Sequence, residues 1–509
     1  MPYTERRLAS AGVRRYGLGP GHSSEHPPGS GFPSTSALRA LAPGREDPAL
    51  VEQLRIRQRG TRLLALSALL SRADLLGHSG PDRLPMAPQV RALFMEADRA
   101  DPEAVTVVLL HPSVGRWLSK ALRTPDQGPV PGGPSGPWSA DHDLHAVAAA
   151  AAIRAGLAFT LPLPVRDGFA VLPTLGSADL RTADSATAHI TVSPDRAEIK
   201  CGEITVRLSQ PGGSVPPGWI PAQSVCTPVR SRSFDLVPDD MDPYRETDGP
   251  VPPSRLSLAE TDRWRQLAGE AQRLLVGAGP RQATIMAVAL TALTPRPAEP
   301  GGVMTSISGS DAFGGVVLNS PPDAVELAAT LVHEFRHMKL NAVLDAVDLY
   351  EEEEDEGLSG SLYYAPWRDD PRPLHGLFHG VFAFFGVVDF WRGLIQHTEG
   401  ETLRRSQFQL AYWRRQTSDA YTTLRTSPQL TANGRLFVAM MSHAPDGWTD
   451  PGSIPGEVAA LAEEAVLAHR ARWRLHHLRP EAAVAAAELA EAWSSGGPQP
   501  PTPPNPHIA

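Results

Sequence analysis

The segment from Ser320 to Leu344 constrains the fold most, because its pattern predicts one unbroken helix with a broad apolar stripe. Ser320 is a suitable N-cap, Pro321 fits the first helical position, and Asp323 stands at capping-box spacing. A glycine-fed edge strand is expected just before it, in the last part of residues 305–318. The apolar residues of the helix then follow three or four positions apart: Ala324, Leu327, Ala328, Leu331, Phe335 and Met338. Such a helix packs against a core, so its polar side chains lie among apolar neighbours.

The middle of this helix carries the motif His333-Glu334-Phe335-Arg336-His337. Two histidines four positions apart lie one above the other, so both imidazoles can reach one divalent ion, with bonds of ~2.0–2.1 Å. Glu334 then points beside the ion, where the corresponding glutamate of zinc proteases is the general base for metal-bound water. We therefore expect His333 and His337 to bind a metal and Glu334 to act beside it.

A working site needs a third protein ligand, which should come from further along the chain. The metzincin pattern would require glycine and histidine where this sequence has Leu340 and Val343, so that class is excluded. A gluzincin-like glutamate could come from the acidic run 351–356, although such a run is more commonly a solvated loop. The other source is His375 and His379, which open a strongly apolar helix that has to be buried.

A basic and aromatic block at 363–372 precedes this second helix. Its Arg368 and Arg372 offer the planar, bidentate contacts that carboxylates favour. Beside a metal, either arginine could clamp a carboxylate co-substrate or a peptide end, while pairing with Asp369 or Asp370 is the structural alternative. Imidazole ligands suit zinc and iron equally, so ligand type alone leaves the metal open.

Charge and composition exclude several other classes of protein. A net charge of −9 and no compact run of lysine and arginine argue against a general nucleic-acid binder. The two cysteines, Cys201 and Cys226, supply neither a disulfide scaffold nor a cysteine-based zinc site. The N-terminus lacks the apolar core of a signal peptide, and the apolar run 146–153 is far shorter than the ~20 residues of a membrane helix. We expect a cytoplasmic protein without a membrane or nucleic-acid partner.

Changes of hydrophobic period along the 509 residues predict an α+β fold that is mainly helical, with a small antiparallel sheet in the middle of the chain. The HExxH motif adds the expectation of a metal site on one of its buried helices. Segments rich in glycine, serine and proline at both ends cannot bury enough apolar surface to become ordered. The expected parts are a disordered N-terminal arm at 1–47, a helical region at 48–157, a small β-rich region at 158–250, a helical HExxH catalytic region at 251–493 and a disordered proline-rich tail at 494–509.

The HExxH helix and the basic and aromatic block at 363–372 resemble those of the HExxH-motif proteins of actinobacterial peptide natural-product (RiPP) clusters, the α-ketoglutarate-dependent HExxH-type peptide β-hydroxylases. The resemblance spans roughly residues 50–480, and its tryptophan-arginine-proline block is much more specific than HExxH. It is carried by residues 331–340, by 364–373 with the following Gly376 and Gly380, and more loosely by 110–117.

The resemblance implies Fe(II), α-ketoglutarate and O₂, and hydroxylation at an unactivated β-carbon of a ribosomal precursor peptide. The site residues that it implies are His333 and His337 as iron ligands, His379 or His375 as the third ligand, and Arg368 or Arg372 on the co-substrate carboxylate. Three coordination positions would remain for two α-ketoglutarate oxygens and O₂. Glu334 would then orient a ligand or the substrate.

Two other functions stay open beside this oxygenase. One is a zinc metallopeptidase of gluzincin type, with Glu334 as base and a glutamate of 351–356 as third ligand. The other is a non-catalytic peptide-binding scaffold. The basic and aromatic block at 363–372 favours the oxygenase over the peptidase, because a peptidase needs no second carboxylate clamp. The scaffold is less favoured because it needs no buried HExxH motif.

Overall fold

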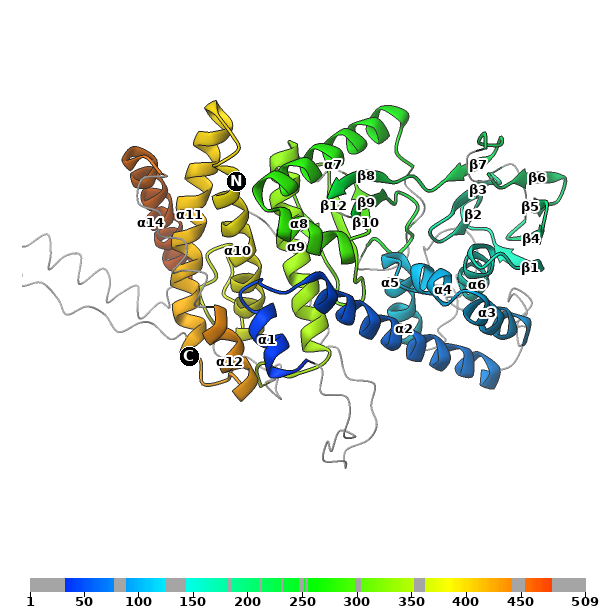
Figure 1. The fold of residues 1–509 in the computed structure, drawn as a ribbon, viewed down its shortest axis with the longest axis horizontal. Coiled ribbons are helices and arrows are strands. Elements are labelled where there is room, and N and C mark those ends of the chain that lie inside the picture. Colours follow the sequence, from blue (N-terminus) through cyan, green and yellow to red (C-terminus); the bar gives the residue numbers. More distant parts are fainter. Residues whose placement is uncertain are drawn as a thin grey trace, which may run out of the picture.

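The chain folds as a mainly helical α+β protein, as its hydrophobic periods predict (Figure 1). The computed structural model describes residues 33–76, 88–123, 143–181, 185–209, 213–229, 232–246, 251, 255–297, 304–351, 362–441 and 454–477. Buried apolar side chains within these ranges form two hydrophobic cores, one smaller and nearer the N-terminus, the other larger and containing the HExxH helix. The two cores give the elongated shape seen in Figure 1.

Four helices form the helical side of the smaller core: α3 Pro88–Ala100, α4 Pro102–Leu109, α5 Pro112–Arg123 and α6 Asp143–Arg154. The first three begin at a proline, whose fixed φ and missing N–H suit the first turn of a helix. The central helix is α6, in which every residue from Leu144 to Ala152 is buried. Its run of alanines lets α3, α4 and β1 approach closely.

Three small sheets replace the single antiparallel sheet that was expected. The smaller core contains two antiparallel sheets, β1-β4-β5-β6 (Phe159–Pro164, Thr187–Ser193, Arg196–Cys201, Ile204–Arg207) and β2-β3-β7 (Phe169–Leu172, Gly176–Asp179, Trp219–Pro221). The third sheet, β11-β12-β10-β9-β8, has the strands Ser306–Ile307, Gly315–Asn319, Ala292–Arg296, Arg232–Pro238 and Val225–Val229. It belongs to the larger core, so the β-rich region does not end as one unit near residue 250.

The third sheet is mixed because helices connect its central strands. Strand β10 runs parallel to both β9 and β12, whereas β8 and β11 pair antiparallel with their neighbours. Between β9 and β10 the chain forms α7 (Leu258–Ala278) and α8 (Pro280–Ala289), a crossover of the kind that parallel pairing requires. The strand predicted in the last part of 305–318 is β12, but it lies inside the sheet, and the edge is the additional short strand β11.

Helix α2 (Pro48–Leu76) joins the two cores. Val51 and Leu54 near its start belong to the larger core, and Leu66 and Leu69 belong to the smaller one. At ~1.5 Å per residue, the 29 residues of α2 span about 43 Å, which lets one rigid element reach across both (Figure 1).

Four further helices complete the larger core: α9 Ala324–Leu344, α10 Leu374–Leu394, α11 Gly400–Arg425 and α12 Ala432–Met441. A fifth helix, α14 Gly456–His477, packs on α11. Helix α10 packs between α9 and α11, and α14 covers the far side of α11 (Figure 1). In the described part of the chain α10 alone is long and apolar enough to cross a bilayer, but 78% of its apolar window is buried inside the protein. A core helix has the same properties, so this is weak evidence for a membrane span.

The HExxH helix ends at Leu344 as predicted but begins later than expected. Its N-cap is Asp323, which is extended and accepts a hydrogen bond from the Glu326 N–H. The prediction of Ser320 as N-cap is therefore wrong. Pro321 stands directly before Pro322, and a residue before proline is driven away from helical backbone angles. The helix therefore does not begin directly after Ser320.

Part of the expected N-terminal arm is ordered. Residues 35–41 form α1 (Thr35–Leu41), which Ser34 caps and whose Leu38 and Leu41 are buried in the larger core. After α1, the carboxylate of Glu46 makes a fully buried ion pair with Lys339 of α9, with 2.5 Å between Oε1 and Nζ. Burial lowers the pKa of Lys339 to about 8, although the charge of Glu46 opposes the shift. Residues 1–32 and the predicted tail at 494–509 lie outside the described residues.

Substituting Glu46→Gln should destabilise the protein by about 3–5 kcal/mol at pH 7, because it leaves the Lys339 ammonium buried without its counter-charge. Urea unfolding measures the loss. The loss should shrink above pH 8, where Lys339 gives up its proton in the folded wild type. The double variant Glu46→Leu/Lys339→Met is the matched control, since replacing the whole pair with apolar side chains should cost little. Equal stability of Glu46→Gln and wild type at pH 7 would contradict a structural role for the pair.

Candidate metal centre

Helix α9 brings the two histidines of the motif into direct contact. Their Nε2 atoms are 2.9 Å apart and their ring centroids 4.6 Å apart. Two nitrogens ~2.1 Å from one ion, at a right angle, would be about 3 Å apart, so the spacing fits a shared metal. The same distance suits one N–H···N hydrogen bond between neutral imidazoles. His333 is buried, with 3% of its surface exposed, whereas His337 is half-buried and forms the accessible side of the pair.

A third imidazole approaches from α10. The ring of His379 stacks on the ring of His337, with centroids 5.6 Å apart and planes inclined by 23°. His375 lies one helical turn earlier and is half-buried. Of the two histidines that the sequence left open, His379 has a ring that stacks on the motif. No three histidine, cysteine, aspartate or glutamate side chains in the described ranges are grouped tightly enough to hold a metal as they stand.

An aromatic wall closes the buried side of this histidine cluster. The ring of Phe384 meets His333 edge-on at 4.9 Å, and Trp367 stacks on Phe384 at 5.1 Å. Trp367 reaches this position because residue 380 is glycine: a Cβ there would lie 2.0 Å from Cζ2 of the indole. The block that precedes α10 therefore packs directly beside His379, and Phe384 is a site residue that the sequence analysis did not single out.

Glu334 is buried and held by the edge strand of the mixed sheet. The hydroxyl of Ser306 in β11 donates a 2.6 Å hydrogen bond to Glu334 Oε1, and only 2% of Glu334 is exposed. A carboxylate in such a place needs a donor, because an unsatisfied buried charge is costly. No local pattern in the sequence marks Ser306 as that donor, since it lies 28 positions earlier.

The two arginines of the block share one aspartate. Arg368 Nε donates to Asp370 Oδ1 at 2.7 Å, and Arg372 Nη1 lies 3.4 Å from Asp370 Oδ2. Burial alone would raise the pKa of Asp370, but the hydrogen bond from Arg368 and the charges of both arginines lower it. The Arg372 side chain also lies over Gly376, where a Cβ would be 2.9 Å from Nε. Of the two partners that the sequence suggested, Asp370 is the one that the structure places between the arginines.

The acidic run proposed as an alternative source of a ligand is mostly outside the described residues. Glu351 alone is described, and it is exposed, with its backbone N–H donating to the Gln429 carbonyl at 2.9 Å. Residues 352–356 belong to a part of the chain that the structure does not describe. The acidic run therefore remains a prediction.

Helix α14 covers the other end of the block. The hydroxyl of Tyr364 and Nδ1 of His469 are 2.8 Å apart, and the Tyr364 ring meets Trp473 edge-on at 5.1 Å. Burial raises the pKa of Tyr364, so its hydroxyl stays protonated. These contacts fix the start of the block and thereby the position of Trp367 beside the histidines.

Comparisons with known proteins add no relative: no family model matches the chain, and no curated protein matches it.

The Gly380→Ala variant should lose about 1–3 kcal/mol of unfolding free energy, because its methyl group overlaps the Trp367 indole, which cannot move away from Phe384 without losing its stacking. Chemical denaturation measures this. Gly376→Ala is the matched control on the same helix: its methyl meets the flexible Arg372 side chain, so the loss should be clearly smaller. Equal losses in both variants would mean that the tight indole contact does not shape this side of the site.

Proposed function

We propose that the chain is an Fe(II)- and α-ketoglutarate-dependent dioxygenase that hydroxylates a β-carbon of a ribosomally made precursor peptide in the cytoplasm. The observation that carries this proposal is the meeting of His333, His337 and His379 from two buried helices. These three imidazoles would hold the metal and would leave coordination positions for a co-substrate and O₂.

The spacing of the two motif histidines and the chemistry of imidazole ligands support iron as the metal. The 2.9 Å between the Nε2 atoms of His333 and His337 suits adjacent positions around one ion, and His379 is the residue that would supply the third nitrogen. When bound, iron with α-ketoglutarate supplies the oxidising power that an unactivated carbon requires. Phe384 and Trp367 exclude water from the buried side of the cluster.

Arg368 and Arg372 are the groups that would bind the carboxylate of α-ketoglutarate. Their pairing with Asp370 shows that their guanidinium groups can receive a carboxylate. Asp370 has 46% of its side chain exposed, so an incoming carboxylate can share or replace it without unpacking a core. Glu334, fixed by Ser306, would orient the substrate or a ligand beside the histidines.

The sheet edge beside Glu334 supports a peptide as substrate. Strand β11 is the last strand of the mixed sheet, and among the described strands none pairs with its outer edge. An extended peptide commonly adds to such an edge through main-chain hydrogen bonds. Because Ser306 of β11 touches Glu334, a peptide docked there would pass close to the histidine cluster.

The zinc metallopeptidase remains the second candidate, and the same contact between Glu334 and the edge strand favours it. A general base has to lie beside the scissile bond of a peptide, and a peptide on β11 would pass the carboxylate of Glu334. The two functions differ in the role of Glu334, which is essential for hydrolysis and accessory for hydroxylation.

Anaerobically purified protein should bind one Fe(II) and form succinate from α-ketoglutarate under O₂, with a product peptide 16 Da heavier than its precursor. His337→Ala should abolish metal binding and succinate formation together. Metal analysis and mass spectrometry measure these quantities. Bound zinc with cleavage of the peptide and no dependence on α-ketoglutarate would establish the peptidase, and protein that binds no metal would establish the scaffold.

His379→Ala and His375→Ala form a matched pair that identifies the third ligand. We expect His379→Ala to weaken Fe(II) binding by ~10-fold or more. Mutation of residues that only support a metal ligand already has an effect of this size, so loss of a ligand should have at least the same effect. His375→Ala should bind Fe(II) nearly as wild type does. Glu334→Gln separates the chemistries, because it should stop a peptidase and leave a hydroxylase with measurable activity. The reverse order of the two histidine variants would assign His375 as the ligand.

A further inference from the structure

A second candidate site lies in a cavity of about 210 Å³. Helices α5 and α6, the sheet β2-β3-β7, and the segment that follows β9 line it. None of the four histidines of the candidate metal centre lines this cavity, and neither does Glu334. It is large enough for many water molecules or for a small organic ligand, since one water needs only ~10–15 Å³.

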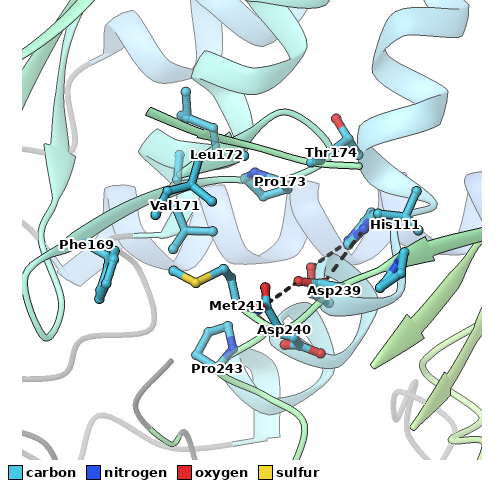
Figure 2. Close-up of a pocket in the computed structure, with 18 of the residues that line it drawn as sticks. His111, Phe169, Val171, Leu172, Pro173, Thr174, Asp239, Asp240, Met241 and Pro243 are labelled. Carbon is cyan, nitrogen blue, oxygen red and sulfur yellow. Dashed lines mark hydrogen bonds and ion pairs between the residues drawn. The ribbon is translucent and has the colours of Figure 1, made fainter. Parts of the chain in front are cut away.

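Most of the cavity wall is apolar. Phe169, Val171, Leu172 and Pro173 form one side, and Met241 and Pro243 form the facing side (Figure 2). A ligand site is commonly an apolar concavity with a few polar groups that fix the orientation of the ligand. These side chains suit the hydrocarbon body of a ligand, and the methionine can adapt to its shape.

Four aspartates line the cavity, and three of them already have an arginine partner. The pairs are Asp143 with Arg166, Asp240 with Arg255, and Asp242 with Arg116. These three carboxylates are therefore compensated by the protein itself. Asp239 is the exception.

Asp239 faces a histidine instead of an arginine. Its Oδ2 is 3.9 Å from Nε2 of His111, and its Oδ1 accepts a 3.2 Å hydrogen bond from the Met241 N–H. Only 15% of the Asp239 side chain and 10% of the His111 side chain are exposed. Among the described residues, no lysine or arginine comes within ion-pair distance of Asp239. Figure 2 shows both side chains pointing toward each other at one end of the cavity.

His111 does not compensate this carboxylate at neutral pH. Burial, together with Arg116 and Arg62, lowers the pKa of His111 to about 4, so its ring is neutral. Burial and the neighbouring charge of Asp242 raise the pKa of Asp239 to about 7, against the effect of Arg116 and with a smaller contribution from Asp240. The cavity thus ends in a carboxyl group that lacks a cation.

We propose that this cavity binds an organic ammonium ion, with the charged amine on the carboxylate of Asp239 and the hydrocarbon body against the apolar wall. A cation at this position supplies the charge that no side chain supplies, and the Nε2 atom of neutral His111 can accept a second N–H. A free alkylamine and the side chain of a lysine in a peptide share this chemistry. This inference does not depend on the proposed hydroxylase activity.

Calorimetric titration of the full chain with n-hexylamine, with 1-hexanol as the uncharged analogue, tests this site. Hexylamine should bind ~10-fold or more tightly than hexanol, because a hydrogen bond to a charged group is stronger than one between neutral groups. Asp239→Asn should remove this preference and remain folded, since it removes an uncompensated charge. The control Glu203→Gln makes the same charge change on an exposed turn and should bind as wild type does. Equal binding of amine and alcohol, or unchanged amine binding in Asp239→Asn, would overturn the proposal.

The pH dependence gives an independent readout. Hexylamine stays protonated from pH 6 to 8, while Asp239 loses its proton near pH 7, so affinity should rise over this range in wild type and stay level in Asp239→Asn. The other charged groups that interact with Asp239 are Arg116, Asp240, Asp242 and Arg245, and all four are kept unchanged in the Asp239→Asn comparison. Affinity that falls as the pH rises would contradict binding to the ionised carboxylate.

A last arm identifies the source of the amine. A blocked pentapeptide with one central lysine is titrated beside the same peptide with norleucine. Displacement of hexylamine by the lysine peptide alone would assign the site to a peptide side chain. Binding of hexylamine without competition from either peptide would assign it to a free amine. Displacement by both peptides equally would overturn recognition of the ammonium group.

Discussion

The rest of the structure depends on helix α9, which places four ionisable side chains inside the larger core. His333, Glu334, Arg336 and Lys339 are each 3% exposed or less. Because buried polar groups are costly without partners, other elements have to meet them: β11 supplies Ser306 to Glu334, the segment after α1 supplies Glu46 to Lys339, and Phe382 of α10 lies under the guanidinium of Arg336. Gly44 and Gly386 leave the room that Arg336 occupies. The HExxH motif therefore organises the packing of the larger core as well as its chemistry.

The mixed sheet relates the two candidate sites. Its edge strand β11 holds Glu334 beside the histidines, and its strand β9 ends immediately before Asp239. Strand β10 between them is anchored to the smaller core through Thr294, whose hydroxyl accepts from Arg116, the residue that also pairs with Asp242 in the wall of the cavity. Helix α2 holds the two cores together along their length (Figure 1). A chain that binds a peptide and an amine would thus use two regions of one continuous framework.

Local sequence signals predicted the class of the fold and the identity of several elements. The end of α9 at Leu344 is where the sequence places it. The sheets and the ordered segment around Glu46 differ from expectation because both depend on contacts between residues far apart in the chain. The N-cap at Asp323 also differs, but for a local reason, since two prolines follow Ser320. Glycine-rich composition suggested disorder around α1, but burial of Leu38 and Leu41 against the larger core orders that segment.

By itself, the sequence determined that two histidines four positions apart lie on one face of a helix, because the period of the α-helix requires it. It also determined that this helix and the next are buried, since their side chains are too apolar for solvent. Only the tertiary structure decided that His379 lies against His337, that Ser306 meets Glu334, and that Asp370 lies between Arg368 and Arg372. Only the tertiary structure decided, too, that Asp239 faces a histidine while the three other aspartates of the cavity pair with arginines. These outcomes depend on how helices and strands pack, and no local pattern encodes the distance between side chains on different elements.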